Sequence, residues 1–231
     1  MTERPTALIT GATRGIGRAI AERLAVDHHL LIGGTRGADA RAVAERFPSA
    51  APFAVDLTDE IATTVAAGRV DRLDVLVHSA GVARYGSIES TDRAAWRRHF
   101  EINTIAVADL TRLLLPLLRE TSGLVVVVNS GSGLVSHPAA PAYCASKFAV
   151  RAFTDALREQ ERGSVRVCSI FPGRVDTDMQ REIQQRLGTA DDDYDGARFV
   201  GAGAVAAAVR LAVDTPANAT VEELTIRPSV E

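Results

Sequence analysis

Several features that are common in membrane, secreted and metal-binding proteins are missing from this sequence. Only two of its 231 residues are cysteines, Cys144 and Cys168, and their separation matches neither a metal site nor a disulfide framework. Apolar runs such as Leu124–Val128 are far shorter than the roughly 20 residues of a transmembrane helix. The start of the chain also lacks the basic flank and long apolar stretch of a signal peptide. We therefore expect a soluble, cytoplasmic protein with reduced thiols and no bound metal.

An excess of charge of one sign is missing as well. The formal net charge is −3, and charged residues make up 24% of the chain. No basic surface therefore points to nucleic acid or to an anionic membrane as a partner. The sequence also contains no internal repeat, low-complexity tract or linker. Since 46% of the residues are hydrophobic, which is enough for one sizeable core, we expect a single domain over residues 1–231.

The chain does contain a regular alternation of short apolar runs and longer helical patterns. The short runs are expected to form buried strands at Ala7–Thr10, Leu30–Gly33, Phe53–Val55, Val75–His78, Leu124–Asn129, Val165–Phe171 and Glu223–Ile226. Helices are expected at Ile16–Val26, Asp39–Phe47, Asp59–Arg69, Asp92–Arg119, Ala142–Arg162 and Ala202–Val213, with Asp59–Arg69 the weakest pattern. This alternation favours an α/β fold with a doubly wound sheet of about seven mostly parallel strands and helices on both faces.

One polar segment breaks the alternation. Residues Met179–Arg198 contain the acidic run Asp191–Asp193 and two glycines, Gly188 and Gly196. Such a stretch is more often a surface loop than a site. In this position, after the sixth expected strand, we predict a loop that can also form a substrate lid.

A glycine-rich segment, TGATRGIG at Thr10–Gly17, directly follows the first expected strand and opens a helix. Glycines permit a tight turn and let backbone N–H groups approach a pyrophosphate at the helix N-terminus. Glycines also occur in turns without a ligand, but this placement favours a dinucleotide site. The residues expected to contact the dinucleotide here are Gly11, Thr13, Arg14, Gly15, Ile16 and Gly17.

The end of the second expected strand bears on the choice between the two nicotinamide dinucleotides. A carboxylate there would bind the ribose 2′-hydroxyl, whereas a basic side chain suits a 2′-phosphate. This strand runs into Thr35 and Arg36 without a carboxylate, and Asp39 is expected to cap the next helix instead. Arg36 and Arg14 can bind a phosphate, or both can be solvated surface residues. We expect NADP(H) in preference to NAD(H), in contact with Thr35 and Arg36.

The strongest pattern is Tyr143 followed four residues later by Lys147, with Ser130 upstream. On a helix the two side chains share a face. A tyrosine normally loses its proton at about pH 10, but an adjacent ammonium and an oxidised nicotinamide would both lower its pKa toward neutrality. Proton transfer requires such a value, and a serine at a strand end can stabilise charge on a substrate oxygen. A Tyr-x-x-x-Lys pair alone is usually a helix face; with the glycine segment and Ser130 it indicates an active site.

With these motifs the chain resembles the single-domain short-chain dehydrogenase/reductase family, whose fold is Rossmann-type, from Thr6 to about Met179. The resemblance implies that Ser130, Tyr143 and Lys147 match the catalytic set. It also implies that Asn103 completes the set by bending its helix and holding a water near the lysine.

The resemblance implies further cofactor contacts. Asp56 and Leu57 would lie at the adenine ring, although Asp56 can also be a helix N-cap. Ala80 and Gly81 would let the backbone pass close to the cofactor. The residues after the sixth strand would hold the nicotinamide carboxamide, namely Pro172, Gly173, Val175 and Thr177.

The sequence departs from the family at His78 and Ser79, where the pattern has two asparagines. The departure puts the usual hydrogen bonds of this turn in doubt. We expect His78 to be a buried, hydrogen-bonded substitute for asparagine and not a catalytic base.

Residues and resemblance together predict an NADP(H)-dependent oxidoreductase that interconverts a carbonyl and an alcohol by hydride transfer. Tyr143 would be the general acid/base and would also contact the cofactor, Ser130 would bind the oxygen, and Lys147 would bind the nicotinamide ribose. One alternative, a non-catalytic dinucleotide sensor, does not need these three side chains. Another, an NAD-dependent epimerase or dehydratase of the extended type, carries a larger C-terminal substrate domain, for which little chain remains.

No motif identifies the small-molecule substrate. Arg174 and Arg151 can meet an acidic substrate, but solvated arginines are the commoner interpretation. Tyr194 and Phe199 can line a pocket or anchor the lid segment. By resemblance, we expect a homodimer or homotetramer that pairs through the long helices.

Overall fold

Seven strands form one sheet in which every pairing between neighbours is parallel. The computed structural model describes residues 4–229. The strands are β1 (Thr6–Ile9), β2 (His29–Gly34), β3 (Ala50–Ala54), β4 (Val75–His78), β5 (Leu124–Val128), β6 (Arg166–Pro172) and β9 (Glu223–Ile226). Their order in space is β3-β2-β1-β4-β5-β6-β9. The expected doubly wound sheet is confirmed, and its order reverses between β1 and β4, where open sheets of this kind bind ligands.

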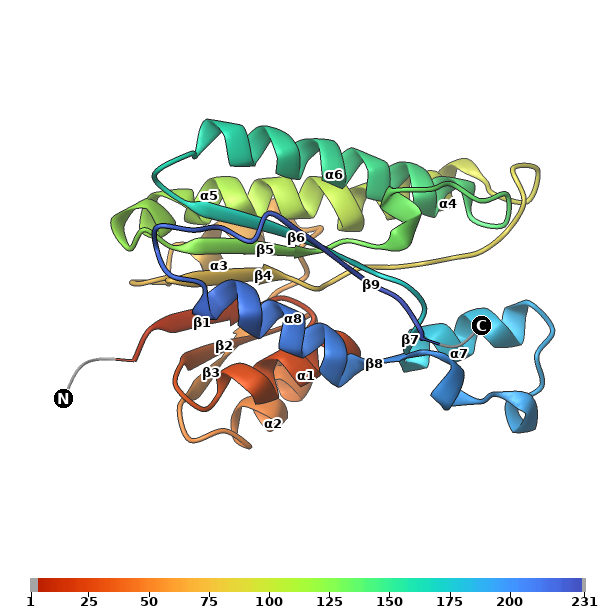
Figure 1. The fold of residues 1–231 in the computed structure, drawn as a ribbon, viewed down its shortest axis with the longest axis horizontal. Helices are drawn as coiled ribbons and strands as arrows, with labels where there is room; N and C mark the ends of the chain where they lie inside the picture. Colours follow the sequence, from red (N-terminus) through yellow and green to blue (C-terminus); the bar gives the residue numbers. More distant parts are fainter. Residues whose placement is uncertain (1–3, 230–231) are drawn as a thin grey trace.

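Helices cover both faces of the sheet (Figure 1). One face carries α1 (Gly15–Leu24), α2 (Gly37–Ala44) and α8 (Ala202–Asp214), and the other carries α3 (Glu60–Ala67), α4 (Arg93–Phe100), α5 (Ala106–Glu120) and α6 (Pro141–Gln160). Neighbouring strand residues alternate between the two cores: Ile9 packs toward α1, whereas Leu8 packs toward α5. Because both faces of the sheet are covered, the central strands β1, β4 and β5 are buried along their whole length.

The helix expected over Asp92–Arg119 is interrupted by a wider turn. Residues Glu101–Ile105 form a π-helical turn between α4 and α5, with Asn103 buried inside it. Such turns are rare and occur frequently at functional sites. The sequence therefore predicts where this helical region begins and ends to within a residue, but it does not predict the π-helical turn inside it.

The prediction of a loop over Met179–Arg198 is wrong in its first half, which is helix α7 (Asp178–Arg186). The Thr177 hydroxyl caps this helix by accepting a hydrogen bond from the Gln180 amide at 3.3 Å. Two short 3₁₀ turns follow, and strands β7 (Val175–Asp176) and β8 (Val200–Gly201) pair in parallel at the base of the segment. Figure 1 shows it as a lobe beyond the carboxyl ends of the central strands. We call residues 177–199 the lid segment.

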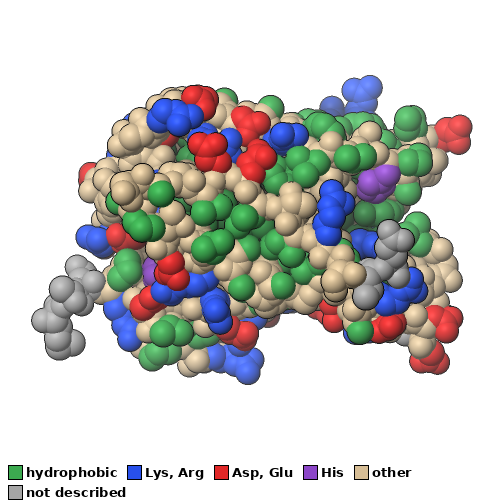
Figure 2. All heavy atoms as spheres, viewed as in Figure 1, with side chains coloured by type: hydrophobic (Ala, Val, Ile, Leu, Met, Phe, Trp, Pro, Cys, Tyr) green, Lys and Arg blue, Asp and Glu red, His purple; other side chains and the backbone are tan. Residues whose placement is uncertain are grey.

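Charges of both signs are scattered over the surface seen in Figure 2. Hydrophobic side chains gather along the middle of that face, where Figure 1 places α8 and β9. The face shown therefore carries no extended field of one sign.

No helix in the part of the chain that the structure describes has the length and apolar character needed to cross a membrane.

Candidate active site

Two adjoining clefts lie at the carboxyl ends of the central strands. The first, which we call the dinucleotide cleft, has a volume of about 330 Å³ and follows the glycine segment, the end of β2 and the turn after β4. The second, which we call the reaction cleft, has a volume of about 520 Å³ and lies between Ser130, Tyr143 and α7. Ile16, Thr177 and Met179 line both clefts, so the two are continuous at these residues.

Close backbone packing explains the glycines of the dinucleotide cleft. Gly11 and Gly15 have φ angles of +65° and +55°, which favour glycine over other residues. A Cβ added to Gly11 would lie 2.9 Å from the Ala80 Cα atom. The N-cap residue of α1, Arg14, makes no side-chain capping bond, so the first N–H groups of the helix are available to a ligand. This donor set and the helix dipole fit the pyrophosphate of a dinucleotide.

The turn after β4 is fixed by a side chain from β1's end. The Thr10 hydroxyl accepts hydrogen bonds from the Ser79 and Ala80 amides, each at 3.0 Å. The turn thus keeps its backbone hydrogen bonds although His78 and Ser79 replace the family's asparagines. His78 itself points into the core and lines neither cleft.

Asp56 lies in the dinucleotide cleft with Leu57. Its carboxylate accepts hydrogen bonds from the Thr58 amide at 3.0 Å and the Thr58 hydroxyl at 2.8 Å. These bonds lower the pKa of Asp56, so the group is ionised at neutral pH. The N-cap of α3 is Asp59 and not Asp56, which removes the capping alternative.

The two arginines expected at a 2′-phosphate lie in different places. Arg14 lines the dinucleotide cleft, as Thr35 does, and its guanidinium lies 3.7 Å from Asp178. Arg36 is not among the lining residues; its side chain is 82% exposed and pairs with Asp39 at 2.7 Å. The prediction that Asp39 caps the next helix is wrong, because α2 begins earlier, at Gly37, and Asp39 lies in its first turn.

Ser130 and Tyr143 line the reaction cleft, and the buried Lys147 lies beside Tyr143. The Ser130 hydroxyl accepts a hydrogen bond from the Ser132 amide at 3.1 Å and forms a second hydrogen bond with the Tyr143 phenol. The Lys147 ammonium lies 5.9 Å from the centre of the Tyr143 ring and donates a hydrogen bond to the Val128 carbonyl at 3.1 Å. The two side chains therefore share one face of α6, as their spacing predicts.

Burial shifts the pKa values of both members of this pair. Burial raises the pKa of Tyr143 to about 12, and the hydrogen bond from Ser130 opposes this effect only in part. Burial also lowers the pKa of Lys147 to about 8. The protein by itself therefore keeps the phenol protonated at neutral pH, and the joint effect of the ammonium and an oxidised nicotinamide on the pKa of Tyr143 stays a prediction.

Asn103 connects the π-helical turn to two neighbouring segments. Its amide oxygen accepts a hydrogen bond from the Val82 amide at 2.9 Å, and its amide nitrogen donates to the Val82 carbonyl at 2.9 Å. The same nitrogen donates to the Ser146 hydroxyl at 3.0 Å. Asn103 is thus bonded to the residue before Lys147 and not to Lys147 itself.

The structure brings most of the expected site residues together. In the dinucleotide cleft it places Gly11, Thr13, Arg14, Gly15, Ile16, Gly17, Thr35, Asp56, Leu57, Ala80, Gly81 and Thr177. In the reaction cleft it places Ser130, Tyr143, Pro172, Gly173 and Val175. The expected residues that line neither cleft are Asn103, Lys147 and Arg36.

Residues from α4, α7 and the loops were not found from the sequence. Arg98 and Ile102 line the dinucleotide cleft from the helix that carries Asn103, at a spacing of four that places both on one face. Tyr85, Ser132 and His137 line the reaction cleft from loops, for which no spacing rule exists. Five residues of α7 and the following turn also line it, and these are Met179, Gln180, Ile183, Gln184 and Leu187.

Comparisons with known proteins agree with this geometry. Residues 5–188 match the family described as short chain dehydrogenase. The chain therefore belongs to the short-chain dehydrogenases, and it is an oxidoreductase that acts on CH–OH or C=O groups with a nicotinamide dinucleotide.

Similar proteins include enzymes with named substrates. An NADPH-dependent 3-dehydrocapnine reductase of Ornithobacterium rhinotracheale is 34% identical over 75% of this chain and 66% of its own. A trans-4-hydroxycyclohexanecarboxylate dehydrogenase of Sinomonas cyclohexanicum is 31% identical over 79% of this chain and 76% of its own. The structure of an alcohol dehydrogenase from the archaeon Thermococcus sibiricus, complexed with 5-hydroxy-NADP, superposes with a TM-score of 0.88 at 25% identity and covers 99% of this chain and 98% of that one.

Proposed function

We propose that this enzyme reduces a carbonyl compound to an alcohol, and catalyses the reverse oxidation, with NADP(H) as cofactor and Tyr143 as general acid/base. The observation that carries the proposal is the Tyr143 phenol, hydrogen-bonded to Ser130 and close to the Lys147 ammonium, in a cleft continuous with the dinucleotide cleft. When bound, the cofactor supplies or accepts the hydride, which is two electrons and one proton.

The chain's own residues supply positioning and the second proton. In reduction, Ser130 donates a hydrogen bond to the carbonyl oxygen, and the Tyr143 phenol gives that oxygen its proton. A phenol with a pKa of about 12 is protonated at neutral pH, which favours this direction. Lys147, with a pKa of about 8, carries a positive charge at neutral pH and stabilises the phenolate that remains.

Several observations support NADP(H) over NAD(H). No carboxylate follows β2 at Thr35 or Arg36, and Arg14 and Thr35 both line the dinucleotide cleft. Arg36 lies one residue beyond Thr35 and pairs with Asp39. If the Arg36 guanidinium left Asp39 and bound a phosphate instead, it would complete a 2′-phosphate site. The names of two similar proteins specify NADPH or an NADP derivative.

The family resemblance supports a homodimer or a homotetramer that pairs through α5 and α6. Apolar side chains at Ile105, directly before α5, and at Phe148 on α6 are 51% and 40% exposed in one chain. Sedimentation equilibrium measures this state.

The proposal is tested by replacing Tyr143→Phe, which keeps the ring and removes the proton. Turnover of a carbonyl panel that includes 4-oxocyclohexanecarboxylate, followed by loss of NADPH absorbance, should fall by about 10²–10⁴-fold, the usual contribution of a general acid. Binding of NADP⁺, measured by titration calorimetry, should stay within about threefold because the phenol is not in the dinucleotide cleft.

A control on the same helix is Thr154→Val. The Thr154 hydroxyl donates to the Val150 carbonyl at 2.7 Å and lines neither cleft, so this variant should turn over at nearly the wild-type rate. Near-normal turnover by Tyr143→Phe would reject the assignment. Wild-type binding of the dinucleotide without turnover of any carbonyl would instead favour a sensor.

A further inference from the structure

The reaction cleft contains positive charge and no carboxylate. Among the described residues that line it, Arg174 and Arg227 are cationic, and no aspartate or glutamate is present. The whole chain has a net charge of −3, so a carboxylate-free cleft with two guanidinium groups is not an average sample of its surface. Low-dielectric walls strengthen the field of such groups toward a bound anion.

The carboxylates nearest to Arg174 in the sequence are bound elsewhere. Asp176 accepts a hydrogen bond from the Tyr194 hydroxyl at 2.8 Å and lies 3.8 Å from Arg181. Asp178 lies beside Arg14, at the dinucleotide cleft. Neither of these acids lines the reaction cleft, so within residues 4–229 they leave the charge of Arg174 unneutralised there.

Aromatic packing holds the Arg174 guanidinium at the wall of the reaction cleft. The guanidinium lies 5.3 Å from the centre of the Phe199 ring, and this ring stacks on Tyr194 at 5.1 Å. Tyr85 and Arg174 both line the reaction cleft, and the charge of Arg174 opposes the rise that burial causes in the pKa of Tyr85. The Tyr85 ring in turn lies 6.5 Å from the Tyr143 ring. Arg174 therefore faces the same space as the proposed acid/base.

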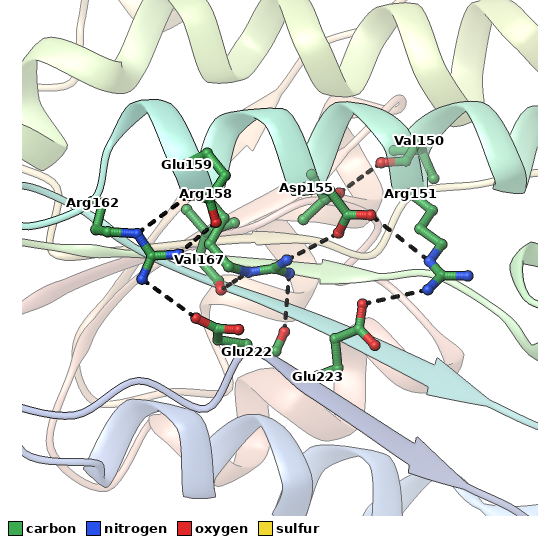
Figure 3. A network of polar contacts seen from close by, with 10 residues as sticks. Val150, Arg151, Asp155, Arg158, Glu159, Arg162, Val167, Glu222 and Glu223 are labelled. Carbon is green, nitrogen blue, oxygen red and sulfur yellow. Dashed lines mark hydrogen bonds and ion pairs between the residues drawn. The ribbon is translucent and has the colours of Figure 1, made fainter.

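Arg151, the other arginine that the sequence offered for an acidic substrate, is occupied. Figure 3 shows it pointing from α6 between Asp155 and Glu223, at 3.8 and 4.0 Å. It belongs to a network of ion pairs between α6 and β9 and lines no part of the reaction cleft. The two arginines thus differ in the property that matters here: Arg151 has carboxylate partners, whereas Arg174 faces a cleft that has none.

The lid segment adds a mixed apolar and polar wall. Gln180, Ile183, Gln184 and Leu187 follow the spacing of one helix face, and all four line the reaction cleft. Two of these side chains are apolar and two are amides that can donate hydrogen bonds. Such a wall fits a substrate with a carbon skeleton and a polar end.

We propose that the substrate carries a carboxylate group, distant from the reacting carbon, and that Arg174 binds this group with help from Arg227. The inference rests on the proposed function and names the substrate class of the same cleft. A guanidinium forms two parallel hydrogen bonds with a carboxylate, which amides and hydroxyls cannot do. Arg174 is thus the specificity-determining residue of the reaction cleft.

The test compares oxo acids with their methyl esters, using 4-oxopentanoate and 4-oxocyclohexanecarboxylate as probes with NADPH. The wild-type enzyme should show at least about a tenfold higher kcat/KM for each acid than for its ester. Arg174→Gln should lower kcat/KM for the acids by about 10–100-fold, the usual range for a charged hydrogen bond, and leave the esters within about twofold. Arg174→Lys should recover part of the loss, and Arg151→Gln should behave as the wild type.

Several results would overturn the inference. Equal kcat/KM for acid and ester in the wild type would do so, as would an Arg174→Gln variant that changes the KM for NADPH and not for the acid. Salt gives a check without a variant: the KM of the acid should rise with ionic strength, and that of the ester should not.

Failure of the proposed function is distinguishable from failure of this inference. If neither acid nor ester is reduced, the proposed function is wrong for these probes. Titration calorimetry with 4-hydroxypentanoate and its methyl ester still tests the anion preference, because it measures binding without turnover. Tighter binding of the acid that Arg174→Gln abolishes supports the inference, and equal binding of the two rejects it.

Discussion

His78 shows how a single residue can depart from a family pattern without loss of the turn it occupies. The side chain is 2% exposed, and its Nε2 donates a hydrogen bond to the Thr111 hydroxyl at 2.8 Å. That hydroxyl donates in turn to the Val107 carbonyl at 2.7 Å. Burial lowers the pKa of His78 to about 3, so the ring is neutral at any physiological pH. The expectation of a buried, hydrogen-bonded substitute for asparagine is confirmed.

This neutral histidine should make the fold sensitive to acid. The unfolded chain protonates His78 near pH 6.5, whereas the folded chain does so only at about pH 3. Stability is therefore fully present above pH 6.5 and falls as the pH drops below it, by about 1.4 kcal/mol per pH unit. The wild-type free energy of unfolding should fall between pH 7 and pH 5, and His78 should account for about 2 kcal/mol of that fall. Urea unfolding of His78→Asn should show a fall that is smaller by this amount.

An unchanged difference between the two pH values in His78→Asn would contradict this account. Because asparagine does not titrate, the comparison separates the proton effect from any change in packing. A packing change lowers stability equally at both pH values, and only the proton effect differs between them.

The sequence identifies those site residues whose positions follow from their spacing along a helix or directly after a strand. Tyr143 and Lys147 are linked by one helical turn, and the glycine segment is linked to the strand before it, so spacing alone predicts their meeting. Tyr85 and His137 come from two loops and meet with ring centres 5.5 Å apart, which no spacing predicts. The pKa of Tyr143 also depends on burial by the whole fold, and pair spacing contains no information on burial.

At the scale of elements, periodicity predicts what the core requires and misses what lies outside it. Strands and helices that pack against the sheet have the expected positions, with ends shifted by a few residues. The sequence predicts a loop at helix α7 because the polar composition there outweighs the apolar positions Ile183 and Leu187. Those two residues face a cleft and not the core, so the helix has only a weak apolar stripe.

One ion-pair cluster joins the first helix to the last. Arg210 on α8 donates two hydrogen bonds to Asp27, at 2.8 and 2.7 Å, and one to Asp214 at 2.8 Å. The hydrogen bond from Arg210 lowers the pKa of Asp27 to about 2. Asp27 follows α1 directly, so the cluster connects segments 183 residues apart in the chain.

Removing this guanidinium should weaken the attachment of α8. We expect Arg210→Gln to lower the free energy of unfolding by about 2 kcal/mol, a value discounted because the Asp27 side chain is 44% exposed. The pKa of Asp27 is depressed, so the stabilisation is present above about pH 4 and is lost as the pH falls toward 2. Urea unfolding at pH 7 and pH 3 measures both effects.

Arg112→Gln is the matched control for this prediction. Arg112 pairs with Asp109 within the single helix α5, and its side chain is 64% exposed. Such a pair contributes about 0.5 kcal/mol or less. Equal losses in the two variants would show that connecting distant elements adds nothing to the value of the Arg210 cluster.

At the scale of the whole molecule, the dinucleotide cleft joins distant parts of the chain. Most of its lining comes from the segments after β1, β2, β3 and β4, but Thr177, Asp178 and Met179 come from the lid segment. A ligand in this cleft therefore contacts both the sheet and the base of the lid. The Arg14 and Asp178 pair, 3.7 Å apart, already spans the two.

Ligand binding should accordingly raise the melting temperature of the entire protein, and more for NADP⁺ than for NAD⁺. A ligand at one hundred times its Kd stabilises the folded state by about 2.7 kcal/mol. For a chain of this size that corresponds to roughly 5–10 °C, measured by differential scanning fluorimetry. Arg36→Gln should bring the NADP⁺ shift closer to that of NAD⁺, because only NADP⁺ carries the 2′-phosphate and Arg14 alone then remains to bind it. Arg23→Gln, an exposed change in the last turn of α1, should leave both shifts unaltered. If NAD⁺ at equal concentration stabilised the wild type as much as NADP⁺, the assignment of Arg14 and Arg36 to a 2′-phosphate would be wrong. Arg36 would then serve only as the ion-pair partner of Asp39.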